Sequence, residues 1–491
     1  MAYCILKSYK LKVQPHRIFE VLRRHKNCFF LDSSLNSSSL GRYSFLGIEP
    51  FLILQSKGQD LSPKLRNILD SYRLAVPKGS LPFLAGAVGY LAYDLGFVLE
   101  KKLARRPKPQ AGIPDCFFGF YNTSVIIDHL KRRLHICAVG FPEKKDSAGR
   151  LLAEKNFKKM HRLLSSLNAD SRGLSRQSIF NEGGIPPSSL VRLAGHSDSR
   201  RCFYLRRSAL DSRESALKLQ VNSNFSQNEY IAAVRKAKEY IKKGDIYQVN
   251  LSQEFSLKTS LSAEQIYQRL RNFSPSCFSA YFDAGDFQIL SSSPERFLKL
   301  DGNIVSTRPM KGTRPRGKNK ARDRGLKEEL LKSAKDKAEL MMIVDLERND
   351  LGRVCDYDSI RVQKLRQIEE YKTVFQTTAT VCGRLHPEKD RIDLLRACFP
   401  GGSITGCPKI RSMEIIEELE PGRRNVYTGC LGYLSFGRDM DFNILIRTML
   451  KKDDQLYFGV GGGVVADSDP QLEYEETLVK ARGMMQAINA L

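Results

Sequence analysis

The chain has 491 residues, of which 42% are hydrophobic and 27% are charged, a balance that excludes wholesale disorder and allows one large core or two domains. There are 79 Lys and Arg against 54 Asp and Glu, so the net charge is +25, which would suit a partner such as nucleic acid or an anionic membrane. The excess is +12 in residues 1–140, +8 in 141–220 and only +5 in 221–491, so most of it lies in the first 220 residues.

Cysteine usage and apolar runs indicate the compartment. Eleven Cys occur singly, with no CxxC pair, which favours reduced thiols in a cytosol-like compartment over a disulfide framework. The first residues alternate like a strand and lack the apolar core of a signal peptide, and no apolar run reaches the roughly 18–20 residues that span a bilayer. We therefore expect a cytoplasmic protein without a membrane partner.

Residues 1–145 are predicted to form a strand-rich N-terminal region. Short apolar runs at 29–31, 43–46 and 51–54 are separated by Ser and Gly, as strands are separated by turns. Residues 125–139 alternate in two arms around a basic turn, and this pattern predicts a β-hairpin.

A basic segment, 146–225, is predicted to link this region to the rest of the chain. Residues 151–167 have helical periodicity. Residues 170–215 are rich in Ser, Arg and Gly, which is the composition of a linker or a surface insertion.

The remaining chain, 226–491, alternates strands and helices. Ser226 and Glu229 form a capping box that begins a helix, residues 324–350 have the pattern of one long helix, and residues 473–491 have that of a closing helix. Many antiparallel-looking strands with helices between them predict a layered α/β (α+β) fold.

Two of these helices carry acidic side chains at helical spacing. Asp336 and Glu339 are three residues apart, and Glu473, Glu476 and Lys480 form a second stripe, so each set shares one helix face. Solvated faces are the common outcome for such stripes. The alternative is a site for Mg²⁺, because an apolar run follows Glu339 and a glycine-rich segment precedes the second stripe.

Two loops carry further candidate chemistry. Lys311 lies in the basic loop STRPMKGTRPRG (306–317), which is either a surface turn or the site of a lysine whose pKa is lowered by like charge and burial until its amine is a nucleophile. Residues 399–421 form a Gly, Ser and Thr loop that runs into a helix. Its amides would suit a carboxylate or phosphate, and a purely structural loop is the alternative.

Several longer motifs resemble those of the chorismate-utilising enzymes, which include component I of anthranilate synthase and of aminodeoxychorismate synthase, and the isochorismate and salicylate synthases. These motifs are DLERNDLGRV (345–354), FPGGSITGCPKIRSME (399–414), GYLSF (432–436), IRT (446–448) and GGGVVADSDPQLEYEETLVKAR (461–482). The resemblance covers 226–491 densely, which it makes the chorismate-binding catalytic domain. It implies an anthranilate synthase component I-like sandwich of two large, mostly antiparallel sheets flanked by helices, with the N-terminal region interleaved.

The resemblance also implies roles for individual positions. Glu339 and Glu476 would hold Mg²⁺, with Asp336 and Glu473 as partners in the surrounding shell. An Arg fork suits the planar carboxylate of chorismate, and the implied substrate pocket is formed by Tyr433, Arg447, Gly461, Gly463, Thr405 and Lys480.

Four positions favour one branch of the family. Gln248 stands where water-adding members use a lysine base, and glutamine cannot deprotonate water. Lys311 stands where anthranilate synthases typically have Ala and aminodeoxychorismate synthases use a nucleophilic lysine, and Glu295 matches the acid that protonates the departing hydroxyl. Gln376 replaces a histidine linked to pyruvate elimination. The resemblance therefore implies an aminodeoxychorismate synthase component that converts chorismate and ammonia to 4-amino-4-deoxychorismate in folate biosynthesis.

Alternatives stay open at this point. Component I of anthranilate synthase is the nearer one, and a basic nucleic-acid-binding protein is remote because no RNA- or DNA-binding motif is present. The sequence has no amidotransferase nucleophile motif, so the resemblance implies a separate glutamine amidotransferase subunit that supplies ammonia. Segment LDSSLNSSS (31–39) resembles the tryptophan-sensing segment of anthranilate synthases, and whether it binds tryptophan is undecided.

Overall fold

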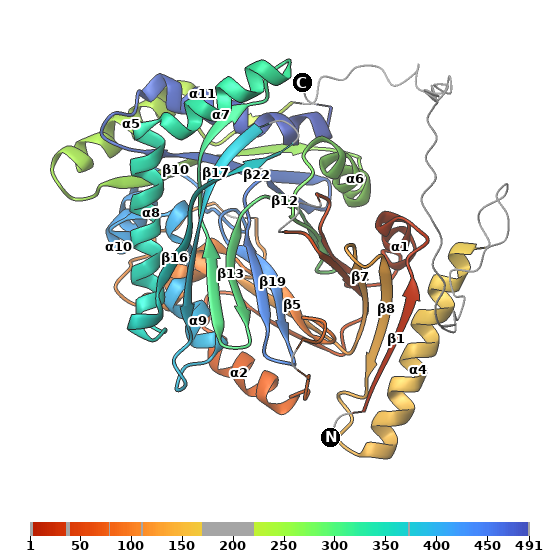
Figure 1. Ribbon diagram of the computed structural model, residues 1–491. Coiled ribbons are helices and arrows are strands. Elements are labelled where there is room, and N and C mark those ends of the chain that lie inside the picture. Colours follow the sequence, from red (N-terminus) through yellow and green to blue (C-terminus); the bar gives the residue numbers. More distant parts are fainter. Residues whose placement is uncertain are drawn as a thin grey trace, which may run out of the picture.

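Two large sheets, in which every strand pair is antiparallel, form the frame of the protein (Figure 1). The computed structural model describes residues 3–35, 40–77, 79–109, 111–168, 220–371 and 374–489. Within these residues the prediction of a layered sandwich of antiparallel sheets with flanking helices is confirmed. The predicted linker 170–215 lies outside the described residues.

The first sheet runs through strands from both ends of the chain. Its order is β1 (Cys4–Lys10), β8 (Arg133–Val139), β7 (Thr123–Asp128), β3 (Tyr43–Gly47), β2 (Phe29–Asp32), β11 (Phe278–Asp283), β12 (Phe287–Ser293), β21 (Thr448–Lys452), β22 (Gln455–Val464), β10 (Gln248–Lys258) and β18 (Gly406–Cys407), with β9 (Asn222–Ser223) beside β10.

The second sheet is built in the same way. Its order is β15 (Met310–Pro315), β17 (Val374–Arg384), β14 (Ile304–Arg308), β13 (Arg296–Asp301), β20 (Met440–Ile444), β19 (Cys430–Ser435), β5 (Gly86–Leu91), β6 (Cys116–Tyr121) and β4 (Leu52–Ser56), with β16 (Arg361–Glu370) beside β17.

The N-terminal region and the C-terminal half share both sheets. In the first sheet Leu31 pairs with Ala280, and in the second Val88 pairs with Tyr433. The regions on either side of the boundaries predicted at residues 145 and 225 therefore contribute strands to the same two sheets.

Helices cover the outer faces of the sheets. The α-helices are α1 (Pro15–Leu22), α2 (Ser62–Ser71), α3 (Gly96–Leu99), α4 (Asp146–Ser165), α5 (Gln227–Lys242), α6 (Ala263–Phe273), α7 (Lys320–Lys332), α8 (Ala334–Gly352), α9 (Arg391–Cys398), α10 (Lys409–Leu419) and α11 (Pro470–Ala487). Short 3-10 helices are η1 (Tyr93–Leu95), η2 (Ser166–Asn168), η3 (Tyr357–Ser359) and η4 (Gly402–Ile404). None of the helices in the described part of the chain is long and apolar enough to cross a membrane.

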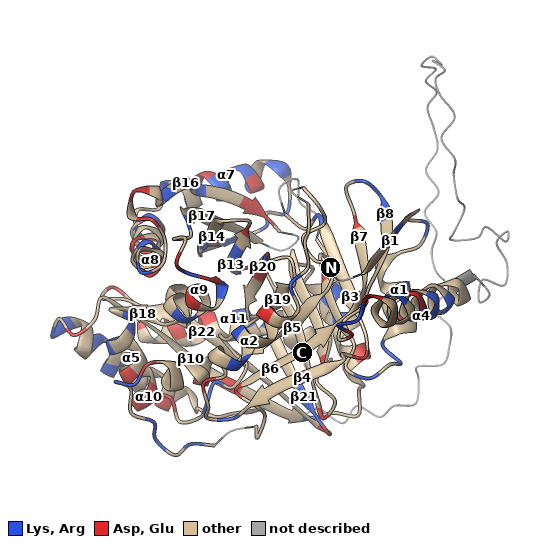
Figure 2. Ribbon diagram, turned by 90° about the horizontal axis from the view of Figure 1, so that it is seen from below, with Lys and Arg blue, Asp and Glu red and all other residues tan. Residues whose placement is uncertain are grey.

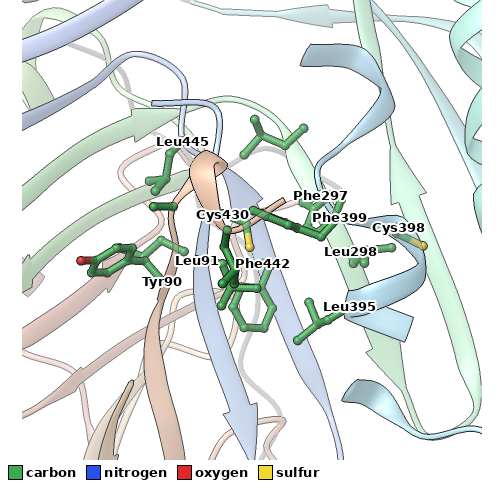
Figure 3. Close-up of a cluster of buried hydrophobic side chains, with 14 of the residues drawn as sticks. Tyr90, Leu91, Phe297, Leu298, Leu395, Cys398, Phe399, Cys430, Phe442 and Leu445 are labelled. Carbon is green, nitrogen blue, oxygen red and sulfur yellow. The ribbon is translucent and has the colours of Figure 1, made fainter. Parts of the chain in front are cut away.

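The core lies between the two sheets. The same cluster extends around the second sheet to α9, where side chains of β5, β13, β19 and β20 pack with those of α9, with Tyr90, Phe297, Phe399 and Phe442 among them (Figure 3). A second cluster lies on the other side of the first sheet, under α1, α4, α6 and α11. Burial of apolar area on this scale is the main term that stabilises the fold.

Two predicted helices illustrate what local signals determine. The capping box of Ser226 and Glu229 begins α5 as expected. The single long helix predicted over 324–350 is wrong, because the chain breaks between α7 and α8 at Ser333, whose ψ of 112° is not helical. The Ser333 hydroxyl accepts a hydrogen bond from the amide of Asp336, so a serine that fits the helical pattern acts instead as the N-cap of α8.

The surface charge is unevenly distributed. Lys and Arg crowd α4, at the edge of the molecule next to β1 and β8 (Figure 2). The helices around the C-terminal half carry both signs, in agreement with the small net charge of residues 221–491.

Candidate active site

The acidic helix α11 lies against the glycine-rich end of β22. A Cβ at Gly462 would lie 3.0 Å from Oε2 of Glu473 and 3.7 Å from Oε1 of Glu476, so only glycine leaves this approach open. Lys480 donates a hydrogen bond to the carbonyl of Gly461 (2.8 Å) and forms an ion pair with Glu476 (2.6 Å). Because both side chains are largely exposed, this cluster faces solvent at one side.

Helix α8 supplies the other carboxylates, and the structure separates them. Glu339 is close enough to Lys311 and Glu476 to interact with their charges, and its burial raises its pKa while Lys311 opposes that rise. Asp336 turns instead to Arg314 of β15, with which it forms an ion pair of 3.1 Å. The structure therefore brings Glu339 towards the α11 cluster and leaves Asp336 at its margin.

The arrangement of these carboxylates limits how they can hold a divalent cation. Within the described residues no group of three or more His, Cys, Asp or Glu side chains could hold a metal ion together. Mg²⁺ is commonly held by one or two carboxylates, with waters and substrate oxygens completing the shell. Glu339 and Glu476 fit that arrangement, whereas a cage made only of protein ligands does not.

Lys311 lies on the opposite face of β22, where successive residues alternate sides. A Cβ at Gly463 would lie 3.0 Å from the Lys311 ammonium nitrogen and 3.0 Å from Nε2 of Gln248. The protein around Lys311 desolvates its ammonium group and lowers its pKa, against the attraction of Glu339, Glu295 and Glu476. Lys311 is thus part of a half-buried cluster of polar groups, which we call the pocket, and not of an exposed surface turn.

Glu295 is the acid of the same pocket. It follows β12, is 4% exposed, and accepts a 2.7 Å hydrogen bond from the Ser403 hydroxyl. Burial raises the pKa of Glu295 to about 7, although Ser403 and Lys311 pull it down. A carboxyl group with such a pKa is partly protonated at neutral pH and is able to donate a proton.

Arg447 brings an uncommitted cation to the pocket. It has a left-handed backbone, with a φ of 50°, and it interacts electrostatically with Tyr371 and Glu295. Its burial lowers the pKa of the guanidinium. Among the described residues none forms an ion pair or side-chain hydrogen bond with it, so the fork can bind an anion.

Gln248 is a pocket residue that the sequence indicated only as a lysine replacement. It is completely buried on β10, and both its side-chain oxygen and nitrogen lack a hydrogen-bond partner among the described residues. Buried amides are almost always satisfied, so this pair of open groups marks a position where a ligand would bind. Gln376, in contrast, donates to Thr313 (3.2 Å), and only its oxygen is left unpaired.

Two predicted substrate residues are placed differently. Thr405 is fully buried, and its hydroxyl donates within its own loop, to the carbonyl of Gly401 at 2.9 Å. Tyr433 lies away from Lys311: its ring packs on Phe45 and Phe83, with centroids 5.4 and 5.0 Å apart, and faces a separate cavity of about 720 Å³.

Tyr427 is the tyrosine that the structure places near the pocket. Its ring lies against Gly459, where a Cβ would come within 2.3 Å of the ring. Gly459, Gly461 and Gly463 share one face of β22 because the side-chain period of a strand is two. Sequence reasoning chose Tyr433 from its motif, and only the alternating glycines could have pointed to Tyr427.

Comparisons with known proteins identify the family. Residues 26–486 match the model of the chorismate binding enzymes. The chain is 34% identical to anthranilate synthase component 1 of Acetivibrio thermocellus, over 96% of this chain and 92% of that protein, and 37% identical to that of Synechocystis, over 94% and 91%. The structure is similar to that of anthranilate synthase component I from Streptococcus pneumoniae, with a TM-score of 0.73, 29% identity and coverage of 92% and 93%.

These relatives contradict the predicted aminodeoxychorismate product. Proteins named anthranilate synthase component 1 match at 32–37% identity over nearly the whole chain, whereas the prediction depended on Lys311 and Gln376. Lys311 and Gln376 are two side chains of one pocket, whereas the similarity to the relatives extends over nearly the whole chain. The isochorismate synthase MenF of Escherichia coli, with a TM-score of 0.70 and 15% identity, shares the fold alone.

The pocket between β22, β15, α8 and α11, together with a family match that spans both halves of the chain, shows that the protein belongs to the chorismate binding enzyme family.

Proposed function

We propose that the protein is component I of an anthranilate synthase and converts chorismate and ammonia to anthranilate, pyruvate and water. The observation that carries this proposal is the 32–37% identity to proteins of that name over nearly the whole chain. The pocket around Glu295, Lys311 and Arg447 supports it, because an acid and an anion-binding fork suit such a reaction. Lys311 adds an amine at a position where anthranilate synthases typically have Ala.

Arg447 binds a carboxylate of chorismate in this proposal. The substrate is a dianion, and a guanidinium fork with no other partner among the described residues gives a planar carboxylate two parallel hydrogen bonds. Gln248 faces the same pocket with a free amide, and the backbone of Gly461 and Gly463 and the loop of Thr405 line it. Tyr433 is not part of this pocket.

Glu295 acts as the general acid. Ammonia forms the new C–N bond on the ring, and the C4 hydroxyl leaves as water when it takes the proton of Glu295. A pKa of about 7 keeps a useful fraction of Glu295 protonated at neutral pH, and Ser403 fixes the carboxyl group by its 2.7 Å hydrogen bond.

Lys311 supplies the base for the second half of the reaction. Loss of pyruvate and aromatisation require that a ring proton be removed, and Gln376 cannot accept a proton at neutral pH. The amine of Lys311 can do so when it is neutral, a state that its desolvated surroundings favour. In this proposal the proton acceptor is therefore Lys311 on β15, and not the residue at position 376 on β17.

Glu339 and Glu476 are the residues that would hold Mg²⁺, with Glu473 and Asp336 in the surrounding shell. When bound, the cation neutralises an anionic group of the substrate and makes a leaving group depart more easily. Lys480 forms an ion pair with Glu476 and donates a hydrogen bond to the carbonyl of Gly461.

A separate glutamine amidotransferase subunit supplies ammonia in this proposal. The designation of the relatives as component 1 implies a second component, and the sequence has no amidotransferase nucleophile motif of its own. Free ammonium would replace this subunit less efficiently, and both components would work in the cytoplasm.

One product assay tests the proposal. The purified chain is incubated with chorismate, Mg²⁺ and ammonium, and the products are separated and identified by fluorescence and mass. Anthranilate and pyruvate in equal amounts are expected. A final product that keeps the pyruvate-derived side chain would contradict the proposal, as would a chain that uses glutamine at full rate without a partner.

A further inference from the structure

We infer that Arg424 and Glu420 form a buried ion pair that positions the loop of η4 against β10, and with it Ser403 and the acid Glu295. Arg424 and Glu420 lie just after α10, and their side chains are only 3% and 4% exposed. The guanidinium makes two hydrogen bonds to the carboxylate, from Nη2 to Oε1 (2.6 Å) and from Nε to Oε2 (2.8 Å). The inference rests on the proposed function only in its use of turnover as one readout.

The guanidinium also connects two separate segments of backbone. Its Nη1 donates to the carbonyl of Ile404 (2.9 Å), and its Nη2 donates to the carbonyl of Asn250 (2.6 Å). Ile404 ends η4, and Asn250 follows Gln248 by two residues on β10. The Arg424 side chain therefore joins the turn that holds Ser403 to the strand that holds Gln248, in addition to the backbone pairing of β18 with β10.

Glu420 completes the arrangement from the other side. Its Oε1 accepts hydrogen bonds from both the amide and the hydroxyl of Ser252, at 2.8 Å each. Arg424 also stacks over the ring of Tyr93, with 4.6 Å to the ring centroid, so the N-terminal region supports the same guanidinium. The guanidinium of Arg424 and the carboxylate of Glu420 are hydrogen-bonded on every side described above, as a rigid buried polar network requires. The hydroxyl of Tyr93 has no hydrogen-bond partner among the described residues.

After η4 the loop is tied to β10 by its backbone, because β18 pairs with β10 and the amide of Asn250 donates to the carbonyl of Thr405 (2.8 Å). Among the described residues, η4 itself has no such backbone pairing with β10. η4 is a single short turn, and the carbonyl of Ile404 lies outside any helix or strand ladder. Ser403 of this turn donates a hydrogen bond to Glu295. Gly402 packs so closely against Leu346 of α8 that a Cβ at this position would lie 2.7 Å from Cδ2 of the leucine. If the loop moves, the carboxyl group of Glu295 loses its fixed orientation, so Arg424 and Glu420 are positioning residues.

Net stability is not the purpose of such a pair. A buried ion pair gains about as much by attraction as its charges lose on leaving water, and its replacement by apolar side chains of similar volume is often neutral. Removal of one partner is costly because it leaves the other charge buried alone. This difference allows positioning to be separated from stability by experiment.

Arg423 is a matched control next to Arg424. It is equally buried and pairs with Glu417 (3.0 Å), and its guanidinium donates to the carbonyl of Arg106. These partners belong to α10 and the N-terminal region, and none of them is in the loop of η4 or in β10. The two arginines thus share chemistry, burial and location but differ in what they hold.

The test compares R424M, E420M/R424M and R423M with the unmodified full chain. Urea unfolding gives stability, steady-state kinetics with chorismate, Mg²⁺ and ammonium give kcat and KM, and hydrogen–deuterium exchange gives the mobility of residues 401–407 and 248–252. We expect the double variant to regain most of the stability that R424M loses, yet to keep a fall in kcat of at least about tenfold, because misplacement of a catalytic group by about 1 Å costs up to about 100-fold. R423M should lose stability and keep kcat within about twofold.

Exchange at 401–407 should be faster in E420M/R424M and unchanged in R423M, whatever product the enzyme makes. A double variant with normal stability, normal kcat and normal exchange would overturn the inference, as would a fall in kcat in R423M equal to that in R424M. If the double variant does not fold, R424K serves instead, because it keeps the charge but cannot reach both carbonyls. An unexpected product from the unmodified chain would refute the proposed function and leave the exchange comparison valid.

Discussion

The two polar cavities of this protein differ in how their charges are paired. In the cavity beside Tyr433, Arg296 and Asp441 form two hydrogen bonds of 2.9 and 3.0 Å, and Lys299 pairs with Asp301 at 2.7 Å. In the pocket beside Lys311, the guanidinium of Arg447 has no partner among the described residues, and both polar atoms of Gln248 are unpaired. Paired charges hold a structure together, whereas unpaired buried groups indicate where a ligand completes the set.

The largest effect should come from Lys311. K311M removes the amine and keeps the length of the side chain, so the proposed base is lost, and kcat should fall by about 1,000-fold. Anthranilate fluorescence measures this loss, and circular dichroism checks the fold. A variant with more than a tenth of the normal rate would show that the pocket does not need the amine.

The second effect concerns the acid. E295Q keeps the shape of the side chain and cannot donate a proton, so kcat should fall by about 100-fold. In the unmodified enzyme the protonated form of Glu295 is the active one, so the rate should decline as pH rises through about 7. E295Q should lose this decline, and a pH profile with the same alkaline limb in both proteins would exclude Glu295 as its source.

Replacement of Asp441 should lower the stability of the protein and leave its catalytic rate unchanged. D441A leaves Arg296 without its carboxylate, in a partly exposed setting, and should lower the free energy of unfolding by roughly 1–3 kcal/mol, between the values of exposed and fully buried pairs. Urea unfolding measures this change. If D441A lowered kcat as much as E295Q does, the contrast between the two cavities would not hold.

Ser403 should change the pH profile of the reaction. Its hydroxyl donates to the ionised form of Glu295 and so lowers the pKa of that carboxyl group. S403A removes this bond, the pKa of Glu295 should rise, and the alkaline limb should move to higher pH by about one pH unit. A limb that moves to lower pH would have the wrong sign for this hydrogen bond.

The smallest effect is predicted for the cap of α8. S333A removes the hydroxyl that accepts from the amide of Asp336 and should cost about 1 kcal/mol in the free energy of unfolding. S226A at the start of α5 is the matched control, since it removes a cap of the same kind far from Glu339. Equal losses of stability with a normal kcat in both variants are expected.

Local signals in the sequence were reliable where the chain decides its own conformation. The capping box at Ser226 correctly predicted α5, but Ser333 was hidden within a helical pattern and acts as a cap because its own ψ is not helical. Motif resemblance brought Glu339, Glu476, Lys311 and Glu295 to attention, and the three carboxylates are close enough to Lys311 to interact with its charge.

Other residues could not have been placed in the same way. The sequence marked Gln248 only as the replacement of a lysine base, and its buried amide without partners is visible only in the structure. Tyr427 is notable only because its ring packs on Gly459 of β22. Tyr433 of β19 lines the other cavity, although its motif is one of those that resemble the family. The burial of a side chain, and the face of the sheet on which it lies, cannot be read from one position of the sequence, since both depend on pairing with distant segments of the chain.

By itself the sequence determined the layered fold and the family, and it proposed most of the polar residues of the pocket, because strand and helix periods and long motifs are local properties of the chain. Only the tertiary structure decided which of those residues meet, since antiparallel pairing joins strands from distant parts of the chain: Lys311 on β15, Gln248 on β10 and the glycines of β22 converge. The net charge of +25, by contrast, identified neither the pocket nor its chemistry, because reactivity there depends on a few placed and desolvated groups.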